Sequence, residues 1–208
     1  MREREAAIVL QAASVCLQYP DASVLALLPV VRTAVEELAP GCARERLRAF
    51  LDTAEATAPG GAAQHYVEVF DNRRRCCLYL TWWSDGETRR RGSALAGLKA
   101  RYRAAGAEFH GTELPDFLPA VLEFAATADL ADGLVLLQEH RAALELLRLA
   151  LVEVGTPYAA PLEAVCALLP GPSPTDVAAA KALARSGPPR EQVGLDLAPF
   201  GARQEGTP

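Results

Sequence analysis

The chain has 208 residues, of which 50% are hydrophobic and 23% are charged, and its formal net charge is −5. This composition allows a packed core for one domain, with or without a tail, and the acidic balance argues against non-specific nucleic-acid binding as the main role. Alanine, leucine, glutamate and arginine are frequent, which favours helices over strands.

Apolar residues recur at helical spacing from the start of the chain. They predict a first helix over residues 3–18, which the Tyr19-Pro20 pair should end. Asp21 is a suitable N-cap for a second helix over residues 22–38. We expect Pro29 to kink or split that second helix, because proline cannot donate the backbone hydrogen bond.

The middle of the chain begins with two further helices, predicted over residues 43–56 and 62–70. The second of these places Tyr66 and Phe70 on one face, four residues apart. Residues 76–83 have a composition that would suit a strand, but a lone strand has no partner in this sequence. We therefore predict a short helix there.

The later part of the chain has the same helical pattern. A basic helix is expected over residues 88–105, and another over 114–128. The strongly amphipathic segment 132–154 predicts one long central helix. Two shorter helices with proline-rich joints are expected over 158–169 and 175–184.

The last segment, residues 187–208, is rich in proline and glycine and has little apolar periodicity. That composition predicts a poorly ordered C-terminal tail. Residues 1–186 are then expected to form one all-helical domain. The predicted fold class is all-α, a single-domain helical bundle followed by this tail.

The chain has no apolar stretch near the ~20 residues of a membrane span. Its first residues include two early glutamates, and the apolar run breaks at Gln11, unlike a secretory signal. The five irregularly spaced cysteines lack a C-x-x-C pair, which is typical of reduced thiols. These features predict a cytoplasmic protein.

No catalytic motif is visible. The chain lacks a phosphate-binding glycine loop, a dinucleotide-binding G-x-G-x-x-G and a G-x-S-x-G nucleophile elbow. His65, His110 and His140 are scattered away from metal-ligand spacing, and His140 is expected to be solvated on a long helix. We therefore predict neither an enzyme nor a metal site.

The segment Tyr66 to Gly92 is the most unusual part of the chain. It holds both tryptophans and two arginine triplets, 73–75 and 89–91. Tryptophan, tyrosine and arginine are enriched at binding hot spots, so the segment is expected to keep a binding surface. For the aromatic residues, core packing is the alternative. For the arginines, the alternatives are a solvated basic face or a site for an acidic partner.

Several motifs resemble the NarJ family, the dedicated assembly chaperones of respiratory nitrate reductase. The resemblance covers residues 17 to about 125. The matching motifs are Leu17-x-Tyr-Pro-Asp21, Tyr66-Val-x-x-Phe-Asp71, Arg74-Arg75, Leu78-Tyr-Leu-Thr81, Gly86-x-Thr-Arg89-x-Arg-Gly92, Glu113-Leu-Pro-Asp-x-Leu-Pro119 and Leu122-Glu-Phe124.

The resemblance implies an all-helical fold shared with the TorD/DmsD group of redox-enzyme maturation proteins. It also implies a non-catalytic chaperone that binds the N-terminal peptide of the nitrate reductase catalytic (alpha) subunit. Such a chaperone keeps the apo-enzyme competent for insertion of the molybdenum cofactor and iron-sulfur cluster before membrane attachment. It binds no cofactor stably itself. Cofactor-delivery proteins are further candidate partners, and neither nucleic acid nor membrane insertion is expected.

A helical scaffold with an aromatic groove suits an amphipathic helix. We predict that one of the paired tryptophans is buried and that the other faces the groove, while Asp116 or an arginine fixes the peptide's direction. Phe117 stands where the wider group often has histidine, so that histidine's role does not transfer. The predicted peptide-binding residues are Tyr66, Phe70, Asp71, Arg74, Arg75, Leu78, Tyr79, Trp82, Trp83, Arg89, Arg91, Asp116 and Phe117. A small helical adaptor that binds an acidic partner through the arginines is the alternative.

Overall fold

The computed structural model describes residues 3–86, 88–109 and 113–186. Within these ranges the chain is helical, as predicted, and the expected tail over 187–208 lies outside the described residues. Its α-helices are α1 (Glu3–Cys16), α2 (Ala22–Glu36), α3 (Cys42–Ala56), α4 (Pro59–Tyr66), α5 (Leu80–Asp85), α6 (Arg89–Ala104), α7 (Leu118–Thr127), α8 (Leu130–Glu139), α9 (Arg141–Val154), α10 (Ala159–Cys166) and α11 (Val177–Ser186). A π-helix, η1 (Val67–Asp71), extends α4, and a 3-10 turn, η2 (Arg74–Cys76), precedes α5.

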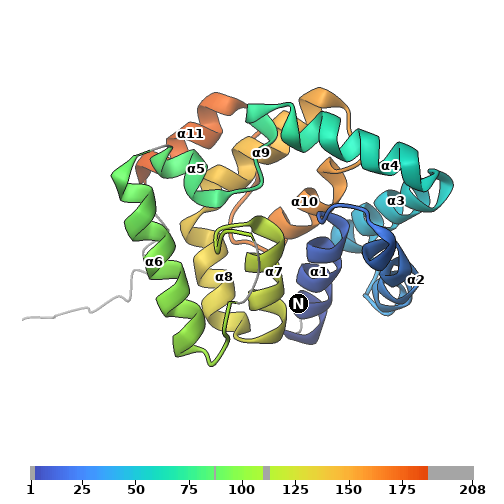
Figure 1. Ribbon diagram of the computed structural model, residues 1–208, viewed down its shortest axis with the longest axis horizontal. Coiled ribbons are helices and arrows are strands. Elements are labelled where there is room, and N and C mark those ends of the chain that lie inside the picture. Colours follow the sequence, from blue (N-terminus) through green and yellow to red (C-terminus); the bar gives the residue numbers. More distant parts are fainter. Residues whose placement is uncertain (1–2, 87, 110–112, 187–208) are drawn as a thin grey trace, which may run out of the picture.

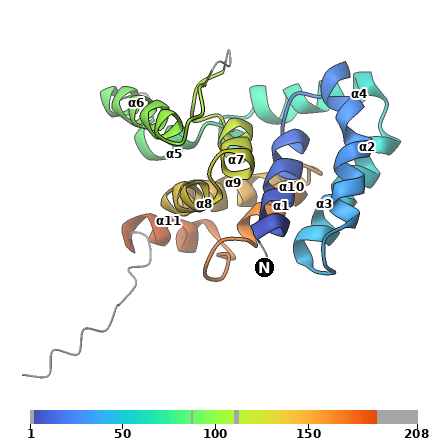
Figure 2. The ribbon, with the colours of Figure 1, turned by 90° about the horizontal axis from the view of Figure 1, so that it is seen from below.

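Two helices distant in sequence form the centre of the domain (Figure 1). Helix α1 packs along α7 and also contacts α2, α3 and α10, while α10 contacts α3 and α9. Figures 1 and 2 show α2 and α3 at one end of the molecule and α5, α6 and α11 at the other. The largest fully buried side chains are all leucines, most of them from α1, α3, α7, α8 and α9. They belong to one hydrophobic core, which joins both ends into a single domain. No helix among the described residues is long and apolar enough to cross a membrane.

Helix α2 is continuous through Pro29, so of the two expected outcomes, a kink or a split, the split does not occur. Pro29 lies on the exposed face of the helix, where water can meet the carbonyl that loses its backbone partner. The predicted N-cap is confirmed, because the Val24 backbone N–H donates to Asp21 Oδ1 at 2.9 Å.

The single long helix predicted over residues 132–154 is also wrong. The structure has two helices there, α8 and α9, which meet at His140. Helix α8 packs on α7, whereas α9 packs on α10 and α11, so the bend lets each apolar face meet a different neighbour. His140 is half-buried at this bend instead of solvated, and burial lowers its pKa.

Two segments expected to be helical are not helical at the point where they meet: residues 77–79 are extended, and residues 114–117 form a turn. Residues 77–79 were expected within a helix, and 114–117 were expected to open one. Instead, Tyr79 and Phe117 form an antiparallel β-bridge. The Leu80 N–H donates to the Asp116 carbonyl at 3.0 Å, and the Leu118 N–H donates to the Leu78 carbonyl at 2.8 Å. The partner that the sequence did not reveal is therefore the segment around Asp116, which lies 35 residues after Thr81 in the chain.

Helices α7 and α8 approach each other closely at Gly133. A Cβ atom built on Gly133 would lie 2.2 Å from the Cβ of Ala125 and 2.4 Å from its Cα. Contacts this short require the backbones to move apart. Glycine is therefore required here for helix packing, in spite of its low helix propensity.

We predict that Gly133→Ala destabilises the protein by about 1–3 kcal/mol, because the added methyl group overpacks the α7–α8 contact. Gly97→Ala is the matched control, since Gly97 lies in helix α6 with nothing within 4 Å of a Cβ. The control should gain up to ~1 kcal/mol from helix propensity. Urea denaturation monitored by circular dichroism measures both changes, and equal effects of the two variants would contradict the close-packing argument.

Candidate functional site

A buried carboxylate, that of Asp116, lies just before helix α7 and is completely shielded from solvent. Its Oδ2 accepts two hydrogen bonds from Thr81, one from the backbone N–H at 3.1 Å and one from the hydroxyl at 2.5 Å. Burial of a charged group is costly unless hydrogen bonds and an opposite charge compensate it. Thr81 is itself buried, so these bonds fix the start of α5 against the start of α7.

The opposite charge comes from the first turn of helix α6. The guanidinium of Arg91 lies 3.6 Å from Asp116 Oδ2, and its Nε donates to the Thr81 hydroxyl at 3.2 Å. The same guanidinium lies 5.9 Å from the ring centroid of Tyr79. Asp116 therefore joins three motif segments, which contain Thr81, Arg91 and Asp116 itself. We call this group the carboxylate junction.

Tyr79 and Phe117 extend from the β-bridge beside the carboxylate junction. Their ring centroids are 5.5 Å apart, and the Tyr79 hydroxyl donates to Glu113 Oε2 at 2.5 Å. Burial and the Glu113 carboxylate raise the pKa of Tyr79, so its hydroxyl remains a neutral donor. The β-bridge thus fixes an aromatic pair and a carboxylate at the molecular surface.

A hollow of about 550 Å³, which we call the central groove, opens between the α1–α2 loop, η1 and the bridged segments. The π-helix turns Phe70 and Asp71 towards it, and π-helical turns are frequent at functional sites. Tyr66 packs against Phe70 with ring centroids 4.7 Å apart and the ring planes tilted by 53°. The groove is lined by Gln18, Tyr19, Asp21, Ser23, Val24, Tyr66, Phe70, Asp71, Cys77, Leu78, Tyr79, Glu113 and Phe117.

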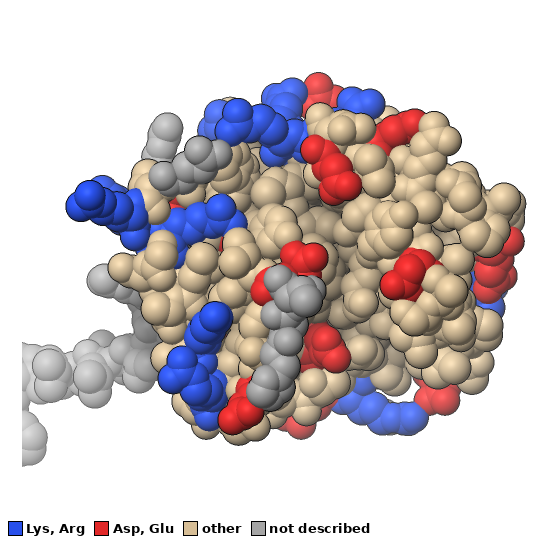
Figure 3. Space-filling model, viewed as in Figure 1, with Lys and Arg blue, Asp and Glu red and all other residues tan. Residues whose placement is uncertain are grey.

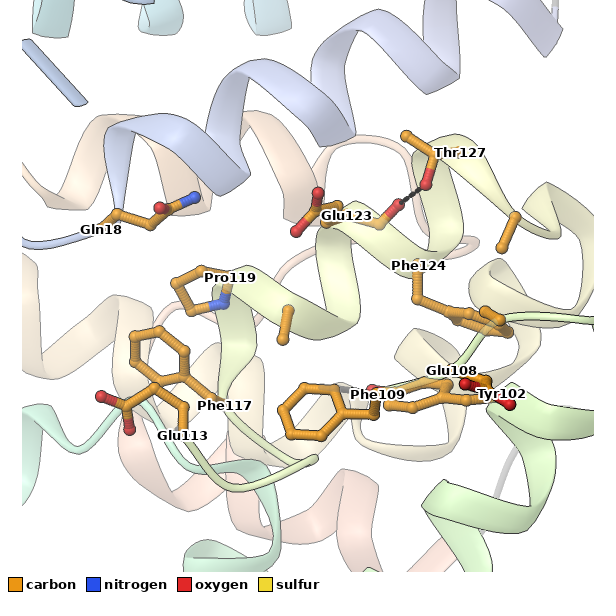
Figure 4. Close-up of a pocket in the computed structure, with 13 residues that line it drawn as sticks. Gln18, Tyr102, Glu108, Phe109, Glu113, Phe117, Pro119, Glu123, Phe124 and Thr127 are labelled. Atoms are coloured by element: carbon orange, nitrogen blue, oxygen red, sulfur yellow. Dashed lines mark hydrogen bonds between the residues drawn. The ribbon is translucent and has the colours of Figure 1, made fainter. Parts of the chain in front are cut away.

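A second hollow of about 430 Å³, the aromatic pocket, adjoins the central groove (Figure 4). The two share three lining residues, Gln18, Glu113 and Phe117. The pocket is lined by these three and by Tyr102, Ala107, Glu108, Phe109, Pro119, Ala120, Glu123, Phe124, Thr127 and Ala128. A smaller and mainly apolar pocket of about 280 Å³ also meets the groove, at Gln18 and Val24.

The described charged side chains that line these two hollows are all acidic. The described lining residues of the central groove and the aromatic pocket include aspartates and glutamates but no lysine or arginine. Figure 3 shows acidic side chains around the hollowed middle of this face, with basic ones mainly towards its edges. The arrangement favours an apolar ligand that carries positive charge.

The structure brings together about half of the predicted site residues. Six of them line the central groove: Tyr66, Phe70, Asp71, Leu78, Tyr79 and Phe117. Asp116 and Arg91 lie behind it in the carboxylate junction, where Asp116 has no exposed surface. These two residues therefore hold the groove wall in place from inside the protein.

The other predicted residues lie outside the groove lining. Trp82 and Trp83 are both half-buried, which corrects the expected division into one buried and one groove-facing ring. The Trp83 Nε1–H donates to the Cys77 carbonyl at 3.0 Å. The guanidinium carbon of Arg74 lies over the Trp82 ring, 5.1 Å from the centroid of that ring. Trp83 also packs against the hydrophobic core, so its ring has an apolar side as well as a polar partner.

The two remaining predicted arginines are exposed. Arg75 lies 3.6 Å from Glu153 of helix α9, and Arg89 begins helix α6. Both side chains lie at the surface, and neither lines the groove or the aromatic pocket.

Sequence reasoning missed several residues of this surface. Tyr19 and Glu113 were part of the quoted motifs, yet neither was assigned to the site. Glu123 also lay in a quoted motif, Leu122-Glu-Phe124, without being assigned to the site, whereas Tyr102 and Phe109 carried no sequence signal that separated them from ordinary helix and loop positions. Among the described residues, no cluster of three histidine, cysteine, aspartate or glutamate side chains could hold a metal ion.

Comparison with known proteins gives a consistent set of relatives. The family model of the nitrate reductase delta subunit matches residues 35–164. The chain is 41% identical over 161 residues to the nitrate reductase-like protein NarX of Mycobacterium tuberculosis, which covers 76% of this chain and 24% of NarX. It is 36% identical over 130 residues to the probable nitrate reductase molybdenum cofactor assembly chaperone NarJ of Bacillus subtilis, covering 62% of this chain and 71% of that protein.

A similar protein from Escherichia coli K12, the nitrate reductase molybdenum cofactor assembly chaperone NarJ, is 34% identical over 110 residues. This match covers 53% of the chain and 47% of the relative. The chain spans about a quarter of the length of NarX. The matched segment of the family model includes η1, the β-bridge and the carboxylate junction.

We predict that Thr81→Val destabilises the protein by about 1–3 kcal/mol, because it removes a donor from a buried carboxylate. Asp116→Asn should also destabilise it, and the double variant should cost less than the sum, since both changes disrupt the same hydrogen bond. Thr33→Val is the control, because the Thr33 hydroxyl bonds only within exposed helix α2. Chemical denaturation measures the free energy of unfolding of these four variants and of the unmodified protein. If the losses of the two single variants add strictly in the double variant, the argument for a shared hydrogen bond is wrong.

Proposed function

This chain belongs to the nitrate reductase delta subunit family, the family of NarJ, and we propose that it is an assembly chaperone for a respiratory nitrate reductase. In this proposal it binds the N-terminal segment of the catalytic (alpha) subunit in the cytoplasm. The bound apo-enzyme stays competent for insertion of the molybdenum cofactor and iron-sulfur cluster before it attaches to the membrane. The cofactor belongs to the partner, and this chain performs no catalysis.

The observation that carries the proposal is the convergence of the motif residues on one groove. Segments near positions 19, 70, 79 and 117 all contribute to its lining, although they are far apart in sequence. The β-bridge and the carboxylate junction hold these segments together from behind. A preformed groove of this kind suits a ligand that binds by shape and apolar contact.

The chemistry of the groove favours an amphipathic peptide helix. Exposed or half-buried rings from Tyr19, Phe70, Tyr79 and Phe117 supply apolar contact area, and such a surface takes the apolar face of a helix at i, i+3, i+4 and i+7 spacing. The adjoining apolar pocket can accept a further side chain. The acidic lining adds a preference for basic residues along the peptide's polar face.

The alternative, an adaptor that binds an acidic partner through its arginines, has less support. Of the arginines in the two triplets, Arg91 is committed to the carboxylate junction and Arg75 lies beside Glu153. Arg74 lies over Trp82. The central groove and the aromatic pocket have carboxylates and no described lysine or arginine in their linings, so these two hollows would repel an acidic partner.

The localisation in the proposal agrees with the state of the cysteines. All five are free thiols, and Cys16, Cys76 and Cys166 are buried. Burial raises the pKa of the Cys16 and Cys166 thiols, which keeps them protonated and unreactive. These thiols fit a reducing compartment.

We predict that Tyr19→Ala weakens binding of a synthetic peptide by about tenfold, because an aromatic contact in the groove is lost. The peptide is the first 15 to 20 residues of the host's nitrate reductase catalytic subunit, with a scrambled sequence as the negative control. Titration calorimetry measures the affinity. Tyr19 is 47% exposed, so the substitution should leave folding intact.

Leu27→Ala is the matched control variant, since Leu27 of helix α2 is 46% exposed and does not line the groove. It should bind the peptide like the unmodified protein. Tyr79→Ala tests the opposite wall of the groove, with circular dichroism to check its fold. If both tyrosine variants fold and bind the peptide with unchanged affinity, the groove is not the peptide site.

A further inference from the structure

The aromatic pocket is a separate feature beside the central groove. Its walls come from the end of helix α6, the segment 107–109 and helix α7. In Figure 4, Glu113 and Phe117 lie at one end, Tyr102, Glu108 and Phe124 lie at the other, and Phe109 is between them. Because the pocket shares Gln18, Glu113 and Phe117 with the groove, a ligand in the groove has direct access to it.

Aromatic rings form much of the pocket surface. Phe109 and Phe117 are half-buried and present their free surface there, while Tyr102 and Phe124 are buried behind them. Tyr102 packs 4.6 Å from Phe124 and 6.0 Å from Phe109, measured between ring centroids. The Tyr102 hydroxyl donates to the Pro115 carbonyl at 2.7 Å, which anchors this wall next to the carboxylate junction. Faces of such rings attract cations, and alkyl stems pack on them.

Carboxylates complete the lining. Glu108, Glu113 and Glu123 lie around the rings, and none of the described lining residues is a lysine or arginine. Glu113 is oriented by the Tyr79 hydroxyl at 2.5 Å. Glu123 projects from α7 on the opposite wall, and its carboxylate forms no ion pair with any residue that the structure describes.

We propose that the aromatic pocket binds a cationic side chain, arginine or lysine, of the segment held in the central groove. This inference rests on the proposed function and assigns a second, chemically distinct part to the same surface. The stem of the cation lies against Phe109 and Phe117, and its charged head lies between Glu113 and Glu123. An acidic side chain at this position of the segment is repelled by both carboxylates.

The pocket adjoins the groove only at Gln18, Glu113 and Phe117, so it can fix the direction and register of the bound segment. A helix could lay its apolar face into the groove in either orientation, because apolar contact is not directional. Only one orientation places a basic residue over the aromatic pocket. Glu123 is therefore a specificity-determining residue. It contributes more to the choice between segments and between their orientations than to the affinity for the correct segment.

The test uses calorimetric titration of the full chain with the same catalytic-subunit peptide. Glu123→Gln should weaken binding about threefold to tenfold at low salt, because it removes the charge and keeps the shape. The difference should shrink at high salt. Glu45→Gln is the control, since Glu45 is an exposed carboxylate on α3, outside the pocket.

Peptides in which each arginine is replaced by citrulline, or each lysine by norleucine, identify the cation. One replacement should weaken binding to the unmodified protein as much as Glu123→Gln does. With that peptide, Glu123→Gln should have no further effect, because the two changes remove one interaction. A peptide carrying glutamate at the same position should regain affinity for Glu123→Lys.

Peptide binding that is indifferent to Glu123→Gln and to every neutral replacement overturns the pocket assignment and leaves the proposed function standing. If no peptide binds, the proposed function fails, and argininamide then tests the pocket alone. Saturable shifts of the Phe109 and Glu123 amide resonances with argininamide, absent with citrullinamide and in Glu123→Gln, support the cation site. Their absence overturns it.

Discussion

The buried carboxylate of Asp116 is the constraint on which the site depends. A completely buried charge is stable only when donors and an opposite charge surround it. Thr81 supplies two donors and Arg91 supplies the charge. These residues belong to the starts of α5, α6 and α7, so compensating one carboxylate fixes the relative positions of three helix termini. The β-bridge between Tyr79 and Phe117 lies beside this carboxylate, so the fixed helix termini also fix the positions of these two residues at the surface.

The groove shows how local irregularity serves the surface above this junction. The chain leaves regular α-helix at the π-turn η1, at the extended residues 77–79 and at the segment before α7. Each departure turns side chains outward that a regular helix would direct along its own face. The surrounding helices α1, α7, α9 and α10 form the buried core. Rigid packing below and irregular backbone above give a preformed cavity, which lowers the ordering cost of binding a flexible peptide.

Charge is separated across the same face of the molecule. From the two arginine triplets, Arg74 lies over Trp82, Arg75 lies beside Glu153 and Arg91 lies beside Asp116. Figure 3 shows basic side chains mainly towards the edges of this face. The hollowed surface is aromatic and acidic. A basic amphipathic segment therefore meets complementary apolar and charged surfaces together. Under the function proposed above, that segment comes from the catalytic subunit of a nitrate reductase.

The sequence by itself determined the helical class, most helix positions and the family, because apolar periodicity and motif spacing are local properties of the chain. It also identified six of the residues that line the groove, through the motifs in which they occur. Only the tertiary structure decided which aromatic residues face solvent, since Trp82 and Trp83 have the same local pattern as groove residues. It likewise decided the bend at His140 and the strand partner of Tyr79. Backbone pairing between distant segments and burial of a carboxylate depend on contacts that form only when the chain is folded. Local sequence patterns therefore do not encode them.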